Sequence, residues 1–463
     1  MPNLLTATLT ANLIATLTML GPPASKPNDS IPIERFTLDN GLKVVLSEDH
    51  SAPIVTTYIT YKVGAAQEQK GFTGFAHLFE HMMFNGSAQV PEGAYAWYID
   101  GTGGSLNGNT ESDRTNYYQT VPSNYLEGML WLEADRMAAL TITEEALANE
   151  KDVVKEEVRQ QQENQPFVKT ILLDWPAAAY SSWEYSHSIY GSMEDLSNAP
   201  VKAFQDFFAR YYVPNNATLV IVGDFDPAAA RGLVEQYFAA IPRGPDNTWT
   251  YPAEAEQTAA VKHEVVDPLA PVPAALISWD IPQPRTKDRD ALELLAAILS
   301  EGPSSRLRKR LIDQDKLALE VAMMSGFPIP TYGPGELLTL LIPANNVDLA
   351  AASKVLWEEI ELVRSKGVSK RELDTARAKK KVEYVRSLGD TLFKAEQLAT
   401  YETFFGGANE FVDDYERFDA ITIKDIQRVA KQYLSVERSV TFEISPPEAS
   451  LGPAGPLGMG GGQ

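Results

Sequence analysis

The chain has 463 residues, of which 44% are hydrophobic and 22% are charged, so it is long enough to bury two sizeable cores. It carries 40 basic and 62 acidic residues, and this net charge of −22 excludes a nucleic-acid partner because phosphate binding requires a basic face. The absence of Cys excludes a cysteine nucleophile, and no Gly-x-Ser-x-Gly motif indicates a serine hydrolase.

Residues 1–30 are expected to be a signal peptide and leader. A moderately apolar, Thr-containing run ends at Gly21, Pro22 and Pro23, as a secretory signal would, although no Lys or Arg precedes Lys26. The run is too short and too polar for a stable membrane span. We therefore expect a bacterial periplasmic protein, with the cytoplasm as the alternative.

The segment from Gly74 to Phe84 carries the strongest chemical signal. Two of the five histidines, His77 and His81, are four residues apart, and Glu80 lies between them. On a helix, such positions lie about 40° apart and one turn up, so both imidazoles can reach one metal ion with Glu80 on the same side as a general base. This order is the inverted form of His-Glu-x-x-His. The alternative is a helix whose histidines only cap or pack.

The next informative segment is an expected strand from Ser105 to Asn109. If it forms the exposed edge of a sheet near the metal, an extended peptide can add to it as a further strand through main-chain hydrogen bonds. Such binding depends more on the main chain of the peptide than on its side chains, so strict sequence specificity is not expected. The alternative is an ordinary strand end in which Asn and Gly form a turn.

A catalytic zinc site typically has three protein ligands, and residues 145–159 are the candidate source of the third. On a helix, Glu157 lies within about 20° of Glu150, and both fall in an apolar stripe, whereas Glu156 lies about 120° away and is expected to be solvated. The apolar residues assigned to this stripe are Leu147, Val153 and Val154. Buried carboxylates are costly unless they are paired or bind a metal. An ordinary Glu-rich helix is the alternative.

A Pro-rich connection at residues 241–262 separates a second half that begins like the first. An alternating strand from Ala274 to Trp279 is followed by a helix from Asp290 to Leu299, which we interpret as carrying no His and no paired acid. The sequence therefore predicts an α+β fold with a catalytic domain at residues 31–240 and a related domain without a metal site at 263–447. Residues 448–463 are Gly-rich and expected to be disordered.

The array His77-x-x-Glu80-His81, with Glu157 further along, resembles the signature of the M16 family of zinc metallopeptidases, which includes pitrilysin and the mitochondrial processing peptidase. Residues 101–110, 131–137 and 211–224 resemble other stretches of the family. The resemblance covers most of residues 31–447 and implies two tandem homologous α/β-sandwich lobes.

The resemblance also implies roles for individual residues. One Zn²⁺ per chain would be bound by His77, His81 and Glu157, with Glu80 as the general base. Glu150 would support the metal ligands, and Asn107 and Gly108 would hold the peptide substrate beside the scissile bond. The other histidines are interpreted as surface or packing residues; they are His50, His187 and His263.

The second half departs from the family pattern. Short-chain members usually carry an Arg and, several residues later, a Tyr that contact the substrate backbone, but an alignment without gaps puts Ile312 and Leu319 there. Neither side chain can donate a hydrogen bond. A one-residue alignment slip is the alternative, with Arg310 close by, although no Tyr occurs between Pro303 and Thr331.

We therefore expect a heterodimer in which a homologous M16-like partner subunit supplies the Arg/Tyr pair. A homodimer is less favoured. Other readings of the chain are a non-catalytic scaffold and a zinc-dependent peptide-binding subunit.

Overall fold

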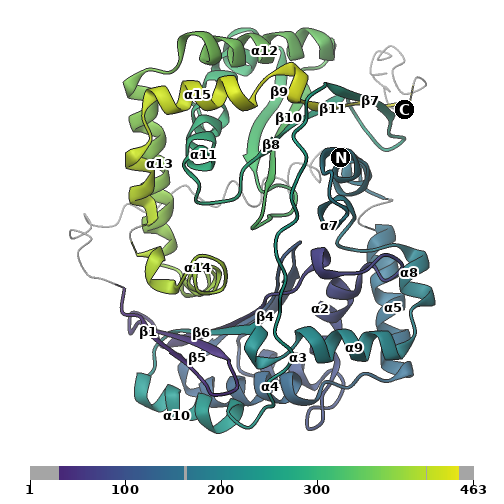
Figure 1. The fold of residues 1–463 in the computed structure, drawn as a ribbon, viewed down its shortest axis with the longest axis vertical. Coiled ribbons are helices and arrows are strands. Elements are labelled where there is room, and N and C mark those ends of the chain that lie inside the picture. Colours follow the sequence, from purple (N-terminus) through teal and green to yellow (C-terminus); the bar gives the residue numbers. More distant parts are fainter. Residues whose placement is uncertain (1–30, 161–163, 413, 448–463) are drawn as a thin grey trace, which may run out of the picture. The chain divides into compact units, whose positions relative to one another are not determined.

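The computed structural model describes residues 31–160, 164–412 and 414–447. The leader expected at residues 1–30 and the disordered tail expected at 448–463 lie outside the described residues. Two mixed sheets with helices against them form an α+β fold, as the sequence predicts (Figure 1).

The first sheet has six strands in the order β1-β2-β6-β3-β5-β4. Strands β2 and β6 are parallel, and the other neighbours are antiparallel. Strand β6 is buried along its whole length because it lies in the middle of the sheet and consists mainly of apolar and β-branched residues. Strand β4 is an edge of the sheet, as predicted for residues 105–109. The bounds are β1 (Glu34–Thr37), β2 (Lys43–Glu48), β3 (Ile54–Tyr61), β4 (Ser105–Thr110), β5 (Thr115–Pro122) and β6 (Ala217–Gly223).

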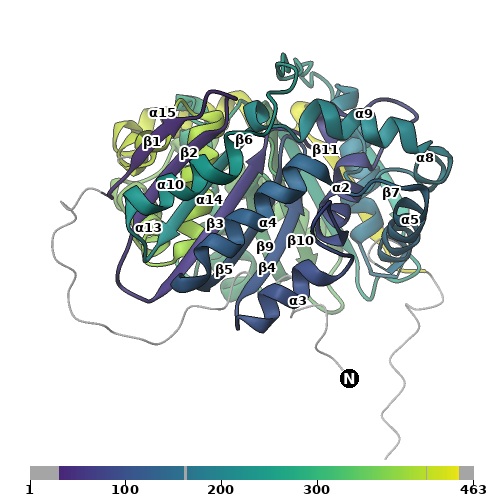
Figure 2. The same ribbon diagram turned by 90° about the horizontal axis from the view of Figure 1, so that it is seen from below.

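Helices of the first half cover one face of this sheet, and α4 and α10 lie across it in Figure 2. Successive residues of a strand point to opposite faces, so Val55 and Ile59 join this apolar core, whereas Thr56 points to the other face. The helices are α2 (Phe75–Asn85), α3 (Ala94–Gly101), α4 (Leu126–Ala139), α5 (Glu144–Val158), α7 (Trp183–Ser186), α8 (Met193–Asn198), α9 (Val201–Tyr211) and α10 (Pro227–Phe238).

The second sheet has five strands in the order β7-β11-β8-β10-β9. Its bounds are β7 (Val261–Val266), β8 (Ala274–Ile281), β9 (Ala318–Ser325), β10 (Gly335–Pro343) and β11 (Val440–Ser445). The helices of the second half are α11 (Lys287–Ser300), α12 (Leu349–Lys366), α13 (Lys370–Ser387), α14 (Thr391–Phe404) and α15 (Ile423–Tyr433). One face of the sheet packs on α11, α12 and α15 around Trp279.

Each half of the chain contributes a helix to the other half's sheet. Helix α14 packs on β3 and β6, where Thr403 and Thr218 hydroxyls are 2.9 Å apart. In the other direction, α6 (Trp175–Ala179) packs on the second sheet, and Trp175 Nε1 donates to Ser278 Oγ at 2.9 Å. Helices of each half thus pack on the sheet of the other half. The domain limits expected at residues 240 and 263 stay a prediction.

Candidate metal centre

The residue immediately before helix α2 is a glycine for a steric reason. Gly74 has φ of 86°, a left-handed conformation that favours glycine, and a Cβ there would lie 2.6 Å from the carbonyl oxygen of Tyr190. The carboxylate of Glu68 accepts hydrogen bonds from the backbone N–H groups of Gly74 at 2.8 Å and Ala76 at 2.9 Å. The first turn of α2 is thus held in place immediately before His77.

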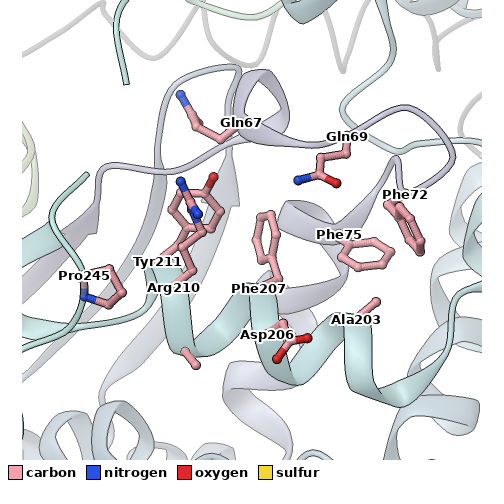
Figure 3. Close-up of a pocket in the computed structure, with 11 residues that line it drawn as sticks. Gln67, Gln69, Phe72, Phe75, Ala203, Asp206, Phe207, Arg210, Tyr211 and Pro245 are labelled. Carbon is pink, nitrogen blue, oxygen red and sulfur yellow. The ribbon is translucent and has the colours of Figure 1, made fainter. Parts of the chain in front are cut away.

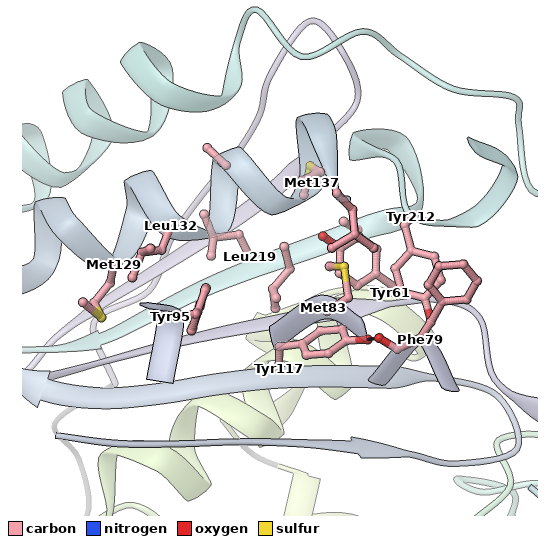
Figure 4. Close-up of a cluster of buried hydrophobic side chains, with 14 of the residues drawn as sticks. Tyr61, Phe79, Met83, Tyr95, Tyr117, Met129, Leu132, Met137, Tyr212 and Leu219 are labelled. Carbon is pink, nitrogen blue, oxygen red and sulfur yellow. Dashed lines mark hydrogen bonds between the residues drawn. The ribbon is translucent and has the colours of Figure 1, made fainter. Parts of the chain in front are cut away.

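The apolar side of α2 sets the direction of its polar side. Phe79 and Met83 are buried in a cluster with the sheet tyrosines, which Figure 4 shows. Tyr117 Oη donates to the backbone oxygen of Phe79 at 3.0 Å. Because this side is anchored in the core, His77, Glu80 and His81 point toward α5 and β4.

Helix α5 brings the acidic residues to α2. Thr143 caps the helix by accepting a hydrogen bond from Ala146 N at 3.2 Å. The buried stripe consists of Leu147, Val154 and Val158. Val153 was expected in this stripe, but its side chain is 51% exposed, because it lies about 120° around the helix from Leu147. Glu156 is exposed, as predicted.

The structure brings His77, His81 and Glu157 together, with one potential ligand atom of each within 4.8 Å of the others. Glu157 Oε2 lies 3.6 Å from His77 Nε2 and 3.1 Å from His81 Nε2. Two imidazoles and one carboxylate are the donor set of many catalytic zinc sites. His77 Nδ1 is buried and has no hydrogen-bond partner among the described residues. The residues present therefore fit a zinc ion.

The pKa shifts of His77 and Glu157 also favour metal binding. Burial and the neighbouring His81 lower the pKa of His77 to about 4, so this imidazole is neutral at pH 7 and has a free lone pair. Burial lowers the pKa of His81, but the hydrogen bond to Glu157 together with the charges of Glu157, Glu80 and Glu150 raises it overall, so a proton on His81 competes with a metal ion. The same bond keeps the pKa of Glu157 below its usual value, so this ligand is a carboxylate.

Glu80 lies between α2 and the edge strand. Its Oε2 accepts a hydrogen bond from Thr110 Oγ1 at 2.7 Å. A Cβ on Gly108 would lie 3.0 Å from Glu80 Cγ, so only a glycine leaves the present room for this side chain. Burial raises the pKa of Glu80, which makes the carboxylate a better proton acceptor than an exposed Glu.

The other predicted residues surround this group. Glu150 Oε2 lies 3.9 Å from His81 Nδ1, on the side of the ring away from Glu157. Burial raises the pKa of Glu150. On β4, Asn107 is exposed and its Oδ1 accepts from Gly108 N at 2.8 Å, while Gly108 is buried.

The second half holds no comparable metal group among its described residues. Its helix α11 does carry a pair of acids, contrary to the sequence interpretation. Asp290 and Glu293 both face Arg417, at 3.4 and 3.7 Å, so a guanidinium balances their charge. Ile312 is partly buried, and Leu319 is 52% exposed on the edge strand β9.

Sequence reasoning missed three residues that support α2: Glu68, His187 and Tyr190. His187 Nε2 lies 3.3 Å from Glu68 Oε2, and the Tyr190 ring packs edge-on against His77 at 4.7 Å between centroids. A carboxylate shortly before a helix start was a usable signal for Glu68. Nothing local pointed to His187 or Tyr190. His50 and His263 lie at the surface, as interpreted.

A cavity of about 470 Å³ lies elsewhere in the first half. It is formed between α9 and the segment that precedes α2, with Phe75, Phe207 and Tyr211 among its walls (Figure 3). None of the candidate metal ligands lines it. The metal group is therefore identified by its ligands and not by a pocket.

Two family models match the chain in succession. The model described as Insulinase (Peptidase family M16) matches residues 43–192, and the model described as Peptidase M16 inactive domain matches residues 198–380. Together they span more than half of the chain, which therefore belongs to the M16 peptidase family. Membership of the M16 family, which the sequence motif predicts, is thus confirmed.

Individual relatives agree with this assignment. The zinc protease PqqE of Helicobacter pylori is 27% identical, over 89% of this chain and 93% of its own length. The crystal structure of a protease from Helicobacter pylori has a TM-score of 0.84 and 25% identity, covering 90% of this chain and 100% of that one. The periplasmic protease PqqL of Escherichia coli has a TM-score of 0.76 and 18% identity, covering 91% of this chain but 49% of that one. These structures confirm the predicted tandem M16 fold.

Among the described residues, no helix is both long and apolar enough to cross a membrane.

Proposed function

We propose that this chain is a zinc-dependent endopeptidase that cleaves extended peptides. The observation that carries the proposal is the convergence of His77, His81 and Glu157, with Glu80 beside them on the same helix as the two histidines. The name of the Helicobacter pylori relative, a zinc protease, supports the same reading. We infer one Zn²⁺ per chain, because these residues form one such group in the part of the chain that the structure describes.

His77, His81 and Glu157 would hold a zinc ion, and that ion would supply Lewis acidity, which polarises a scissile carbonyl and lowers the pKa of water from about 15.7 toward about 7. Glu80 acts as the general base: its carboxylate takes the proton of the attacking water and returns it to the leaving amine. Thr110 holds Glu80 in place, and Glu150 orients His81. No covalent acyl-enzyme is required.

The peptide binds along the edge strand β4. An extended chain can pair there because β4 is an edge strand whose one neighbouring strand among the described residues is β5, so its outer side can offer main-chain hydrogen bonds to a peptide. Asn107 and Gly108 lie on this strand, and a Cβ on Gly108 would lie 3.0 Å from Glu80 Cγ, so a peptide paired there lies close to the general base.

A partner subunit completes the substrate site. The apolar side chains of Ile312 and Leu319 cannot donate hydrogen bonds to a peptide, so a homologous M16-like subunit supplies the Arg/Tyr pair in a heterodimer. Leu319 is exposed on a sheet edge, where a longer polar side chain would have room. This chain covers 49% of the PqqL chain. One PqqL polypeptide is therefore long enough to contain a second unit of this size. We also propose a location in a bacterial periplasm, because residues 1–30 are expected to be a signal peptide and leader and because PqqL is a periplasmic protease.

Replacing Glu80 by Gln tests the proposal. The change keeps the shape of the side chain but removes the base, so peptide hydrolysis should fall by about 10²–10⁴-fold while zinc content is unchanged. Digestion of a peptide library, followed by mass spectrometry, measures the first quantity, and elemental analysis measures the second. Glu156→Gln is the matched control on α5, because Glu156 is exposed.

Undiminished hydrolysis by Glu80→Gln would overturn the assigned mechanism. If the wild-type chain binds zinc and peptide but never cleaves, alone or with a partner, it is a zinc-dependent peptide-binding subunit. If it binds neither, it is a non-catalytic scaffold.

A further inference from the structure

Glu68 is a buried carboxylate with no place in the chemistry proposed above. It precedes α2, and its two oxygens accept from Gly74 N at 2.8 Å and Ala76 N at 2.9 Å. Amides at a helix start have no acceptor within the helix, so an external carboxylate satisfies them and also meets the positive end of the helix dipole. The next residue after Ala76 is the candidate ligand His77.

His187 holds Glu68 from the other side. Its Nε2 lies 3.1 Å from the carbonyl oxygen of Ala65 and 3.3 Å from Glu68 Oε2, and its Nδ1 lies 2.8 Å from the carbonyl oxygen of Trp183. Every one of these partners is an acceptor, so the ring satisfies them by donating from both nitrogens, which is the protonated form. Burial lowers the pKa of His187, but Glu68 and the two carbonyls raise it more.

The segment that carries His187 contacts the start of α2 at further points. Asp195 Oδ2 accepts from Thr73 N at 3.0 Å and from Thr73 Oγ1 at 2.5 Å. A Cβ on Gly191 would lie 2.4 Å from Gly74 N, which shows how closely the two backbones approach. Tyr190, from the same segment, packs its ring against His77.

We propose that Glu68 and His187 form a positioning pair that fixes the first turn of α2 and thereby holds His77 in the orientation that binds the metal. The pair links three segments of the chain: the turn at Ala65, the start of α2, and the distant stretch that carries Tyr190. Without it, two helix amides lose their acceptor and the segment behind His77 loses its anchor. This inference rests on the proposed zinc site, but zinc affinity tests it without any peptide.

The test uses the full chain with Glu68→Gln or His187→Gln. The first change keeps one acceptor oxygen of the two, and the second keeps a donor without the charge. We expect zinc affinity, measured by competition with a chelator, to weaken by about 10–100-fold in each variant, as for other residues that orient metal ligands. Hydrogen exchange of the metal-free chain should be faster at the amides of Gly74 and Ala76. With zinc saturating, kcat should fall while KM changes little.

His50→Gln is the matched control. His50 also contacts a carboxylate, with Nδ1 2.6 Å from Asp224 Oδ1, but this pair is exposed and lies just beyond the ends of β2 and β6. The variant should bind zinc as the wild type does. If Glu68→Gln does not fold, Glu68→Asp, which keeps the charge on a shorter side chain, and His187→Gln carry the test.

Folded variants with wild-type zinc affinity and wild-type exchange at the start of α2 would overturn the positioning role and show a purely structural pair. A wild-type chain that binds zinc but cleaves no peptide would overturn the proposed function alone, because the affinity and exchange measurements still report on the pair.

Discussion

Thr110 Oγ1 donates a hydrogen bond of 2.7 Å to Glu80 Oε2 and so joins helix α2 to the edge strand β4. The residue proposed to move the proton is therefore held by the strand proposed to bind the peptide. Thr110 is buried and Glu80 is partly buried, and a hydrogen bond to a charged group has a larger effect where water is partly excluded.

Thr110→Val should remove this bond at nearly constant volume. A hydrogen bond to a charged group is worth about 1.5–3 kcal/mol, so we expect kcat to fall by about 10–100-fold with zinc content unchanged. Steady-state kinetics on a fluorogenic peptide measure the change. Thr37→Val, at an exposed position of β1, is the control and should leave kcat as it is. Equal kcat for both variants would contradict a role for Thr110.

Glu157→Gln and Glu150→Gln should differ in their effect on zinc. A potential ligand atom of Glu157 lies within 4.8 Å of those of both histidines, so one metal ion can contact all three. Loss of Glu157 should therefore weaken zinc binding more than the roughly 10–100-fold expected for a residue that only orients a ligand. Glu150 is expected to show that smaller effect. Chelator competition gives both constants, and a Glu150 effect as large as that of Glu157 would instead make Glu150 a ligand.

Gly108→Ala tests the contact between β4 and Glu80. The new methyl group would lie 3.0 Å from Glu80 Cγ and 3.2 Å from Phe84 Cε2, so Glu80 has to shift and kcat should drop. Gly232→Ala is the control, because nothing lies within 4 Å of its added Cβ and a helical Gly→Ala change stabilises by about 0.5–1 kcal/mol. Urea unfolding separates lost stability from lost activity. Full activity in Gly108→Ala would show that Glu80 does not need this space.

Asp49 and Lys394 tie α14 to the first sheet, with Asp49 Oδ2 2.6 Å from Lys394 Nζ. Burial raises the pKa of Asp49, but the bonds to Lys394 and Ser51 lower it more, to about 2 from 3.8. A lowered folded-state pKa means that the stabilisation is complete above the unfolded value and is lost as the pH falls toward 2. Asp49→Asn should therefore be less stable than the wild type at pH 7, and the difference should shrink between pH 3.8 and about 2.

The control for this pair is Asp374→Asn, at an exposed residue that pairs with Lys370 and, at 3.5 Å, with Arg377. An exposed pair of this kind contributes about 0–1 kcal/mol, so its removal should matter little at any pH. Urea unfolding at several pH values measures both variants. A difference for Asp49→Asn that does not depend on pH would contradict the assignment to this ion pair.

The double change Ile312→Arg and Leu319→Tyr should raise the peptidase activity of the chain by itself. It supplies an Arg and a Tyr at the two positions where this chain has apolar side chains, so KM for a peptide should decrease. Val266→Tyr, at an exposed position on the opposite edge of the second sheet, is the control for adding a tyrosine. High activity of the unaltered chain without any other subunit would remove the need for a partner.

Much of the metal centre could be predicted from sequence because its spacing is local. His77, Glu80 and His81 share one helix, and helical geometry alone puts them on one side. The same reasoning found Glu150 and Glu157 on α5. It misplaced Val153, because one apolar residue can lie on the solvent side of a helix without a large cost, so a stripe inferred from composition is wider than the one that is buried.

The amino-acid sequence by itself predicted the candidate ligands, the proposed base and the fold class, because these predictions depend on residue identity and on periodicities of a few residues. Only the tertiary structure decided that Glu68 and His187 meet at the start of α2, and that α14 covers the sheet of the other half. These contacts join residues more than a hundred positions apart, and the free energy of such contacts depends on burial and packing that no short sequence window contains.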